Sequence, residues 1–438
     1  MNAYKTGILI AMILSTAVLL FSLPATAADE VFKAGAAMRL ITPNPLIPVS
    51  GGMGKPNPVT AKTGELTTRV LVLEKGGTRV AIVSVDNLGW PMLLGDKSRA
   101  KIKGIAPENI IIGCTHTHSA PDAYGFPDET GVSGADQKYL EWACDQIAEA
   151  VNDAVSKLEP AVIRIAMGKA EGKIAYNYYA PQLYDPRCGV IQAVATTGDR
   201  KGKAIATLVN YAIHPEIIGN SQGLLGPDLC GPLYERVEQK AGGVAVFMNS
   251  AQGGMVTADN RDPNGGHHDI ETYEECVRIG NLLADEALRI LGDTPAQENP
   301  TLYVAARPIT FPIDSPIMRA VFLLSPLGAT MNPDNGYTSR LNLVNLGSAQ
   351  ILTIPGEALP NVGFYVKRHM PTGHCFLFGL TNDALGYMMT AVDYESFERY
   401  DYISRTCLGE RTADIFCAEA LKFIADSPKP DPMPAGKK

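Results

Sequence analysis

The sequence lacks the features that mark several large classes of protein. It has no CxxC or CxxCH motif, which argues against a thiolate zinc knuckle and against covalently attached haem. It has no basic cluster and a net charge of −8, which argue against a nucleic-acid-binding surface. After the N-terminal segment, no stretch approaches the roughly 18 apolar residues that a membrane span needs. What remains is the composition of an ordinary globular protein, with 46% hydrophobic and 19% charged residues.

The N-terminal segment has the pattern of an export signal. Lys5 supplies the positive charge, residues 7–23 are mostly apolar, and Ala25 and Ala27 form a small-x-small cleavage site. An uncleaved membrane anchor is the alternative, but polar residues interrupt the apolar run and a proline precedes the cleavage site. We therefore expect residues 1–27 to be removed as a signal peptide. The mature protein is then exported, to the periplasm or beyond the cell, with no stable membrane span.

Eight cysteines in an exported chain make disulfides plausible. Cys407 and Cys417 are close enough in sequence to close a short loop. Cys114 belongs to an apolar run, and we expect it to be buried and free.

Apolar runs and amphipathic stretches alternate through the first part of the chain. Residues 69–74 and 80–85 are typical of a β-hairpin that turns at Gly76 and Gly77. Residues 135–158 and 270–291 have the periodicity of long amphipathic helices. Further strands are predicted at residues 110–114, 162–166, 190–195, 204–211, 244–247 and 375–380, and further helices at residues 97–103, 227–242, 358–368 and 412–425.

The rest of the chain has a different character. Residues 32–46 look like a loop-rich lead-in, and three segments between residues 301 and 354, including residues 319–324, look strand-rich. No internal repeat or low-complexity linker interrupts residues 30–426. We predict an α/β fold with a mixed β-sheet core and flanking helices, in one large domain that spans residues 28–426. The proline-rich residues 427–438 are expected to form a disordered tail.

The most informative segment is residues 115–121 (THTHSAP), which follows the strand predicted at residues 110–114. On an extended chain His116 and His118, two positions apart, point to the same side. Two imidazoles on one side suit a metal ion, or a metal ion with a proton shuttle. One satisfied core histidine and one exposed histidine are the alternative, and the pair alone does not decide between them.

Two more segments combine an apolar strand with a sudden polar or glycine-rich turn. In residues 208–215, His214 precedes a proline and is a candidate third imidazole. The other histidines, His267, His268, His369 and His374, lie in polar or helical surroundings that indicate solvation. In residues 247–257, paired glycines allow backbone N–H groups to approach an anionic centre, with Ser250 and Thr257 as hydroxyl candidates. A simple tight turn is the alternative for this segment.

Two later turns carry an acid and a phenol. Glu357 comes directly after a predicted buried strand that ends at residues 352–354 and a Pro-Gly pair, where it either serves a site or caps the next helix. Residues 380–387 form a polar turn that ends in Tyr387.

Together these segments resemble the neutral, non-lysosomal ceramidase family, in its N-terminal catalytic domain. The matching residues are 115–121 (THTHSAP), 210–215 (NYAIHP), 355–357 (PGE) and 382–387 (NDALGY), in the family's order with similar gaps. The resemblance implies one Zn²⁺ ion held by His116, His214, Glu357 and Tyr387. It implies that His118 is a proton shuttle or an oxyanion donor.

The implied function is that of an exported zinc hydrolase, which cleaves the amide bond of an N-acyl lipid such as ceramide with a zinc-activated water. The sequence departs from the family in one turn, residues 254–259 (GMVTAD). The family has Gly-Asp-x-Ser-Pro-Asn there, so Met255 replaces the Asp and Thr257 replaces the essential Ser. A threonine hydroxyl can still donate or attack, and attack by water needs no protein nucleophile.

Two other functions fit the same residues. One is hydrolysis of another acyl ester, lactone or amide. The other is a non-catalytic ligand-binding protein that kept the fold and lost the chemistry. The altered turn at Met255 and Thr257 favours the non-catalytic binding protein. Retention of all four expected ligands together with His118 opposes a loss of the chemistry.

Overall fold

A computed structural model describes residues 30–127, 130, 132–263 and 269–434. Residues Val31–Lys438 group into one unit, which is the part described below. The expected signal peptide, residues 1–27, lies outside the described residues. Within the described part, none of the helices has both the length and the apolar character needed to cross a membrane.

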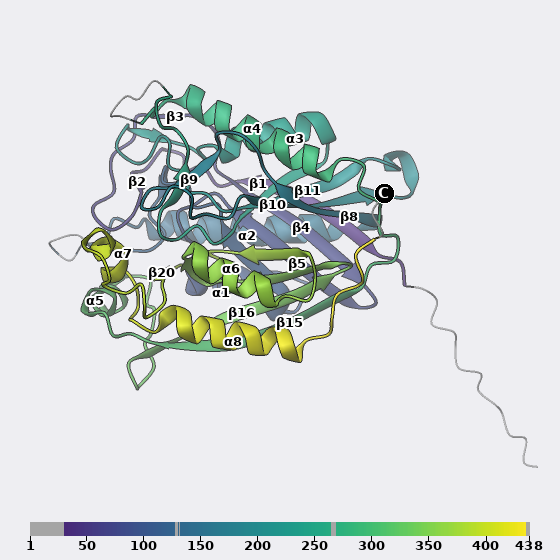
Figure 1. The fold of residues 1–438 in the computed structure, drawn as a ribbon. Coiled ribbons are helices and arrows are strands. Elements are labelled where there is room, and N and C mark those ends of the chain that lie inside the picture. The colour runs from purple at the N-terminus through teal and green to yellow at the C-terminus, as the bar shows by residue number, and fades with distance from the viewer. Residues whose placement is uncertain (1–29, 128–129, 131, 264–268, 435–438) are drawn as a thin grey trace, which may run out of the picture. The chain divides into compact units, whose positions relative to one another are not determined.

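An eight-stranded mixed sheet is the largest element of the fold, with strand order β13-β11-β10-β8-β1-β4-β5-β6 (Figure 1). Its strands are β1 (Lys33–Leu40), β4 (Thr67–Lys75), β5 (Thr78–Val85), β6 (Ile110–Cys114), β8 (Glu159–Lys169), β10 (Arg187–Ala195), β11 (Ala204–Tyr211) and β13 (Val244–Asn249). The sheet curls so strongly that the Ser84 hydroxyl in β5 donates to the Phe247 carbonyl in β13 at 2.5 Å. This curl brings the ends of β6 and β13 together although they are the two edges of the sheet.

A second sheet of four strands packs against the first. It contains β15 (Leu302–Pro312), β16 (Gly336–Leu346), β17 (Ala349–Thr353) and β19 (His374–Phe378) in that order. The apolar core between the sheets includes Leu71, Ile82, Ile111, Ile191, Leu208 and Val246 from the large sheet and Val344, Ile351, Phe376 and Phe378 from the small one. In each strand the alternate side chains face this core, as the two-residue period of a strand requires.

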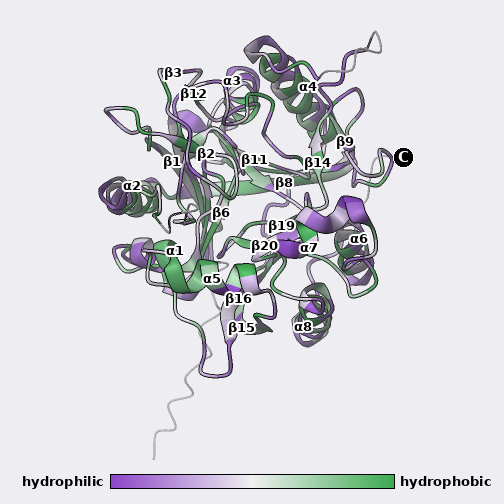
Figure 2. Cartoon of the chain, turned by 90° about the vertical axis from the view of Figure 1, so that its left-hand side faces the viewer, coloured by the Kyte–Doolittle hydropathy of each residue, from purple (hydrophilic) through white to green (hydrophobic). Residues whose placement is uncertain are grey.

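Helices cover the outer faces of both sheets (Figures 1 and 2). The large sheet is covered by α1 (Met92–Arg99), α2 (Gln137–Ser156), α3 (Cys230–Ala241) and α4 (Tyr273–Leu291), and the small sheet by α6 (Pro360–His369) and α8 (Thr412–Asp426). The result is a four-layer α/β/β/α arrangement. It confirms the predicted α/β fold with a mixed-sheet core and flanking helices.

Two local predictions were wrong. Residues 319–324 were expected to be strand, but they belong to helix α5 (Pro316–Leu324). The side chain of Ser315 accepts the Met318 N–H, and Pro316 occupies the first turn, so local capping selects the helix. A short apolar run does not by itself distinguish strand from helix. The lead-in at residues 32–46 was expected to be loop, but it contains β1 in the middle of the large sheet.

The expected tail and disulfides also differ from the structure. Asp431 accepts hydrogen bonds from the Thr301 N–H and hydroxyl at 2.8 and 2.6 Å, so the stretch that includes it is tied to the small sheet rather than disordered. Residues 435–438 lie outside the described part. All eight cysteines are free, and the Cys407 thiol donates to Thr412 instead of pairing with Cys417. Cys114 is buried and free, as expected.

Candidate metal centre

Asn249 joins the two loops that carry the first two candidate ligands. His116 lies just past the end of β6, and His214 lies just past the end of β11. The buried Asn249 amide donates to the carbonyls of Thr115 and Ile213 at 3.0 and 2.7 Å, and its Oδ1 accepts the Ile213 N–H at 3.2 Å. An amide that pairs with both loops holds them in register, because each buried bond lost leaves an unsatisfied polar group.

His116 and His118 converge, but not by the expected geometry. The strand ends at Cys114, and His116 has a left-handed backbone with φ of 73°. Residues other than glycine rarely adopt this backbone conformation, because it costs about 1–3 kcal/mol. It is found where function or packing demands it. The His116 N–H donates to the Asn87 carbonyl at 2.9 Å, which holds the turn. The two rings come to 4.9 Å between centroids because the chain turns, not because it stays extended.

His116 and His214 each have one ring nitrogen anchored and the other free. Nδ1 of His116 donates to the Leu88 carbonyl at 2.6 Å, and Nδ1 of His214 donates to the Val256 carbonyl at 2.9 Å. A carbonyl only accepts, so each Nδ1 carries a proton and Nε2 is the nitrogen left to bind a metal, once any proton on it has been released. This is how metal-bound histidines are usually oriented.

Glu357 completes the group. Its Oε2 lies 3.6 Å from Nε2 of His116 and 3.3 Å from Nε2 of His214. In tetrahedral zinc sites with bonds of about 2.0–2.1 Å, neighbouring ligand atoms are about 3.3 Å apart. The distances from Oε2 to the two Nε2 atoms are therefore both close to the ligand–ligand spacing of a zinc site. Glu357 does not cap the next helix, because Leu359 holds the N-cap position of α6.

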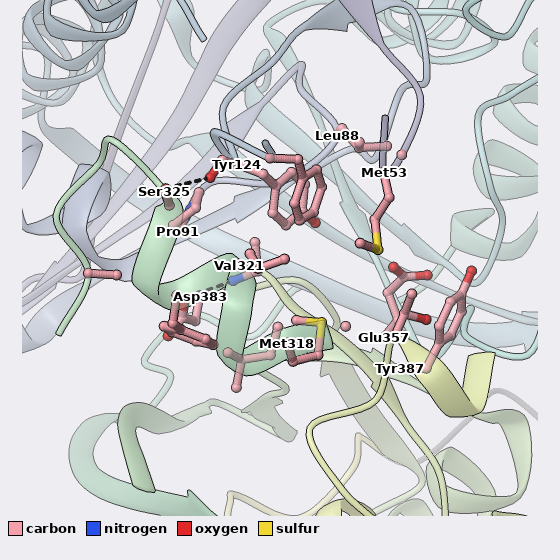
Figure 3. Close-up of a pocket in the computed structure, with 18 of the residues that line it drawn as sticks. Met53, Leu88, Pro91, Tyr124, Met318, Val321, Ser325, Glu357, Asp383 and Tyr387 are labelled. Atoms are coloured by element: carbon pink, nitrogen blue, oxygen red, sulfur yellow. Dashed lines mark hydrogen bonds between the residues drawn. The ribbon is translucent and has the colours of Figure 1, made fainter. Parts of the chain in front are cut away.

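Tyr387 lies beside Glu357 on the neighbouring strand. Glu357 is in β18 (Gly356–Ala358) and Tyr387 in β20 (Leu385–Met388), where the two residues are register partners. Figure 3 shows the two side chains next to each other. The Tyr387 hydroxyl donates to Sδ of Met255 at 3.1 Å. Burial, followed by the Glu357 carboxylate, raises the pKa of Tyr387 well above its usual range, so the phenol stays protonated unless a cation reverses the balance.

The paired glycines Gly253 and Gly254 allow the turn after β13 to pack closely against the strand that carries Glu357. A Cβ on Gly253 would lie 2.2 Å from the Glu357 carbonyl oxygen, closer than any side chain permits. The Gly253 N–H donates to the Ala358 carbonyl at 2.9 Å. The glycine pair therefore serves close packing against β18. This is a structural role, and the turn does not aim the Gly253 N–H at an anion.

Burial and charge divide the three imidazoles. Burial lowers the pKa of both His116 and His118 to about 3, so these rings are neutral. Burial also opposes a charge on His214, but Glu216 and Glu357 outweigh it and raise its pKa to about 9. Burial opposes ionisation of Glu357 as well, yet His116 and His214 hold its pKa below the usual range. The metal-free site thus contains a protonated His214 beside an ionised Glu357.

Glu216 is a residue that sequence reasoning missed. Its Oε2 lies 3.5 Å from Nδ1 of His118, while Nε2 of His118 is buried and has no hydrogen-bond partner among the described residues. A carboxylate two positions after a candidate ligand was the available signal, but nothing in the sequence connects it to His118. The contact orients His118 with Nε2 free.

The residues present fit a zinc ion. In the part of the chain described, Nε2 of His118 is buried without a hydrogen-bond partner, and Nε2 of His214 and Oε2 of Glu357 are buried with only the charge contacts among His116, His214 and Glu357. Leaving such groups unpaired is costly unless something binds them. Ring nitrogens of His116, His118 and His214 all lie within 4.8 Å of one another, so three histidines form a second possible ligand set beside the two histidines and Glu357. Imidazole nitrogen and carboxylate oxygen are both ordinary zinc ligands.

Thr257 lies next to the group without facing the cavity. It is in β14 (Val256–Ala258), and its backbone bridges to that of His214. Its side chain is not among those that line the cavity beside the site. A direct part for Thr257 in catalysis remains a prediction.

An apolar cavity of about 110 Å³ opens from the group (Figure 3). Its apolar walls come from Met53, Leu88, Pro91, Leu93, Phe126, Met318, Val321, Phe322, Leu327 and Leu385, and its polar lining includes His116, His118, Glu357, Tyr387 and Tyr402. Figure 3 places Glu357 and Tyr387 on one side and Val321, Pro91 and Ser325 on the other. A cavity of this kind suits a ligand with one reactive polar group and a long apolar part.

Comparisons with known proteins agree with this architecture. The sequence matches no protein-family model and no curated protein. The structure is similar to a crystal structure of neutral ceramidase from Pseudomonas aeruginosa, with a TM-score of 0.72 and 17% identity, over 94% of this chain and 77% of that one. It is also similar to a structure described as a ceramidase complexed with C2, with a TM-score of 0.70 and 18% identity, over the same shares. The chain therefore has a neutral ceramidase-like fold, as the sequence motifs predicted.

Proposed function

We propose that this protein is a zinc-dependent hydrolase that cleaves the amide bond of an N-acyl lipid of the ceramide type. The observation that carries the proposal is the position of Glu357, whose Oε2 faces Nε2 of both His116 and His214 beside an apolar cavity. The ceramidase-like fold supports the same substrate class. Tyr387, as the strand neighbour of Glu357, is the proposed fourth ligand.

Zinc in this site would polarise the substrate carbonyl and activate a water for attack. His118 is placed to move the protons, because its free Nε2 lies at the cavity and its Nδ1 faces Glu216 at 3.5 Å. As a neutral imidazole, it can take a proton at Nε2 and then deliver it to the amine that leaves. Glu216 favours the imidazolium that forms between these two steps, since its carboxylate is close to Nδ1.

The apolar walls bind the acyl chain and keep bulk water away from the reacting carbonyl. Exclusion of water strengthens every charge interaction at the site. Hydrolysis of the amide by water gives a fatty acid and an amine, and it requires no protein nucleophile. This agrees with a Thr257 side chain that does not line the cavity.

We also propose that the protein is exported, because residues 1–27 have the pattern of a cleaved signal peptide. Determining the mass and N-terminus of the protein from cells tests this, and an intact N-terminal segment would contradict it.

The function is tested by metal content and by activity on matched substrates. Purified protein is expected to hold about one zinc per chain and to hydrolyse an N-acyl sphingoid base. Chelation is expected to abolish the activity, and added zinc to restore it. An acyl ester and a lactone of equal chain length serve as comparisons. Faster turnover of either would move the proposal to another acyl substrate, and no turnover by zinc-loaded protein would favour a binding function.

A further inference from the structure

Helix α5 is apolar on every side and still lies at the surface. Arg319 is the only charged residue of the helix, and Met318 is the only one that is buried. Figure 2 colours the helix mostly as hydrophobic. A helix without a polar face is normally covered, either by the rest of the protein or by lipid.

The two sides of α5 have different surroundings. Met318, Val321 and Phe322 point inward, where they line the cavity, and the Phe322 ring lies 4.6 Å from that of Tyr337. Ala320, Leu323 and Leu324 follow at three- and four-residue spacing, which places them on the opposite side of the helix. Leu323 is 67% exposed and Leu324 is 55% exposed. One helix therefore forms both the cavity wall and an exposed apolar surface.

More exposed apolar groups lie at the same opening. Met53 and Tyr402 both line the cavity, yet they are 40% and 44% exposed. The two residues are close in space, because a Cβ on Gly52, the neighbour of Met53 in the chain, would lie 3.5 Å from the Tyr402 hydroxyl. In Figures 1 and 2, α5 lies near α7 (Asp401–Arg405), which carries Tyr402. Single exposed apolar residues are ordinary, but a group around a cavity mouth marks a binding surface.

The charge of this segment fits a phospholipid headgroup layer. Residues 315–331 contain one charged residue, Arg319, in a chain whose net charge is −8. The Arg319 guanidinium lies against the protein, because Nη2 donates to the Ile313 carbonyl at 2.6 Å and Nε is buried. The segment therefore brings no carboxylate of its own to repel lipid phosphates.

From this we infer that α5 is part of a lipid-contact surface, in which Met53, Ala320, Leu323, Leu324 and Tyr402 dip into a phospholipid bilayer. This inference rests on the proposed function, since it explains how an N-acyl lipid reaches the site. Met53 and Tyr402 are exposed and also line the cavity, so an acyl chain can pass from the lipid into the cavity along apolar side chains. The protein attaches peripherally, with its cavity mouth against the lipid.

The test measures binding to phosphatidylcholine vesicles that contain no substrate. Leu323→Glu with Leu324→Glu adds two charges to the surface, and Tyr273→Glu with Tyr365→Glu adds the same charge to exposed positions on α4 and α6. The α5 variant is expected to lose at least about tenfold in vesicle partitioning. The control is expected to change less than about twofold, because a zwitterionic bilayer only weakly repels a distant charge.

A second measurement does not depend on loss of binding. Leu323→Trp in a Trp142→Phe background puts a new indole on the surface, and its emission is expected to shift to the blue on adding vesicles. Equal partitioning of the α5 variant and the wild type would overturn the inference, as would an indole that does not respond. A wild type that ignores vesicles but forms an oligomer, which the α5 variant dissociates, would make this face a contact between copies instead.

These outcomes are separate from failure of the proposed function. Turnover of a short, water-soluble N-acyl amide requires the site but no bilayer. Activity on that substrate without vesicle binding overturns only the lipid-contact surface. Vesicle binding without any turnover overturns only the hydrolase.

Discussion

At the scale of single residues, the arrangement around His118 is the most particular feature of this site. Its Nδ1 faces Glu216 at 3.5 Å, and its Nε2 is buried and unpaired within the described structure. His116 and His214 instead use Nδ1 on backbone carbonyls and turn Nε2 to Glu357. The three imidazoles therefore have two kinds of environment, which suits two metal ligands and one acid–base group.

We predict that His118→Ala keeps zinc and loses most of the activity. A positioned acid–base group contributes about 10²–10⁴-fold to a rate, so kcat should fall by that amount. Glu216→Gln should cost less, since it weakens only the support of the imidazolium. Zinc content and kcat of each variant give the answer. Loss of zinc from His118→Ala would assign that residue to the ligands, as the three-histidine set allows.

We predict partial activity for Thr257→Ala. Its side chain does not line the cavity, so at most it contributes one hydrogen bond to the developing oxyanion. Losing one such donor costs about 10²–10³-fold in rate, which leaves a measurable reaction. Thr257→Ser serves as the control. An acyl adduct on Thr257, seen by mass spectrometry with a slow substrate, would instead establish covalent catalysis.

We predict that zinc binding releases about one proton more at pH 8 than at pH 10. The pKa of His214 is about 9 in the metal-free protein, above its unfolded value of about 6.5. The stabilising charge on His214 is therefore fully present below pH 6.5 and is lost as pH rises through 9. Zinc needs the neutral ring, so at pH 8 it must displace this proton. Calorimetry in buffers of different ionisation enthalpy measures the release, and equal release at both pH values would refute the assignment.

At the scale of elements, the ends of strands supply the site and short connections position it. Asn249 at the end of β13 pairs with the loops after β6 and β11, and Gly253 lets the following turn pack on β18. Neither residue touches the cavity. Both nevertheless decide where the candidate ligands stand.

We predict that Gly253→Ala weakens zinc binding more than it weakens the fold. The added Cβ would lie 2.2 Å from the Glu357 carbonyl oxygen, so β18 must move. Overpacking of this kind costs about 1–3 kcal/mol of stability, and the shift also displaces a ligand. Gly168→Ala is a suitable control, because the three atoms nearest to its Cβ all belong to the Ile290 side chain, the closest at 3.1 Å. Unchanged zinc affinity in Gly253→Ala, measured by competition with a chelator, would count against Glu357 as a ligand.

At the scale of the whole molecule, the candidate ligands come from both parts of the sandwich. His116 and His214 follow strands of the large sheet, while Glu357 and Tyr387 follow strands of the small sheet. A metal ion bound by all of them would link the two sheets. Metal binding then adds to the stability of the whole unit by mass action.

We predict that chelation lowers the unfolding temperature of the wild type. Zinc at 100 times its dissociation constant stabilises the folded state by about 2.7 kcal/mol, and removing zinc forfeits that amount. Calorimetric scans with and without a chelator measure the difference. His214→Ala is the control, since a protein without the site should not respond. The same fall in both proteins would place the bound zinc elsewhere.

Much of the fold followed from local patterns. The hairpin of β4 and β5, the long helices α2 and α4 and the final helix α8 were all predicted, because each has a clear period of its own. Helix α5 was missed, since a short apolar run fits a strand equally well and the cap at Ser315 was overlooked. β1 was not predicted, because the prolines that follow the strand made the whole of residues 32–46 look like a loop.

The sequence by itself determined which chemistry was available: two close histidines, a third before a proline, an acid and a phenol, each just past an apolar strand. These are local facts, and a single chain segment carries each of them. The tertiary structure alone decided that the His116 backbone turns at φ of 73°, that Asn249 binds two loops, and that Glu216 faces His118. The reason is that these contacts join segments far apart in sequence, and only the curled large sheet and the sheet packed against it bring such segments together.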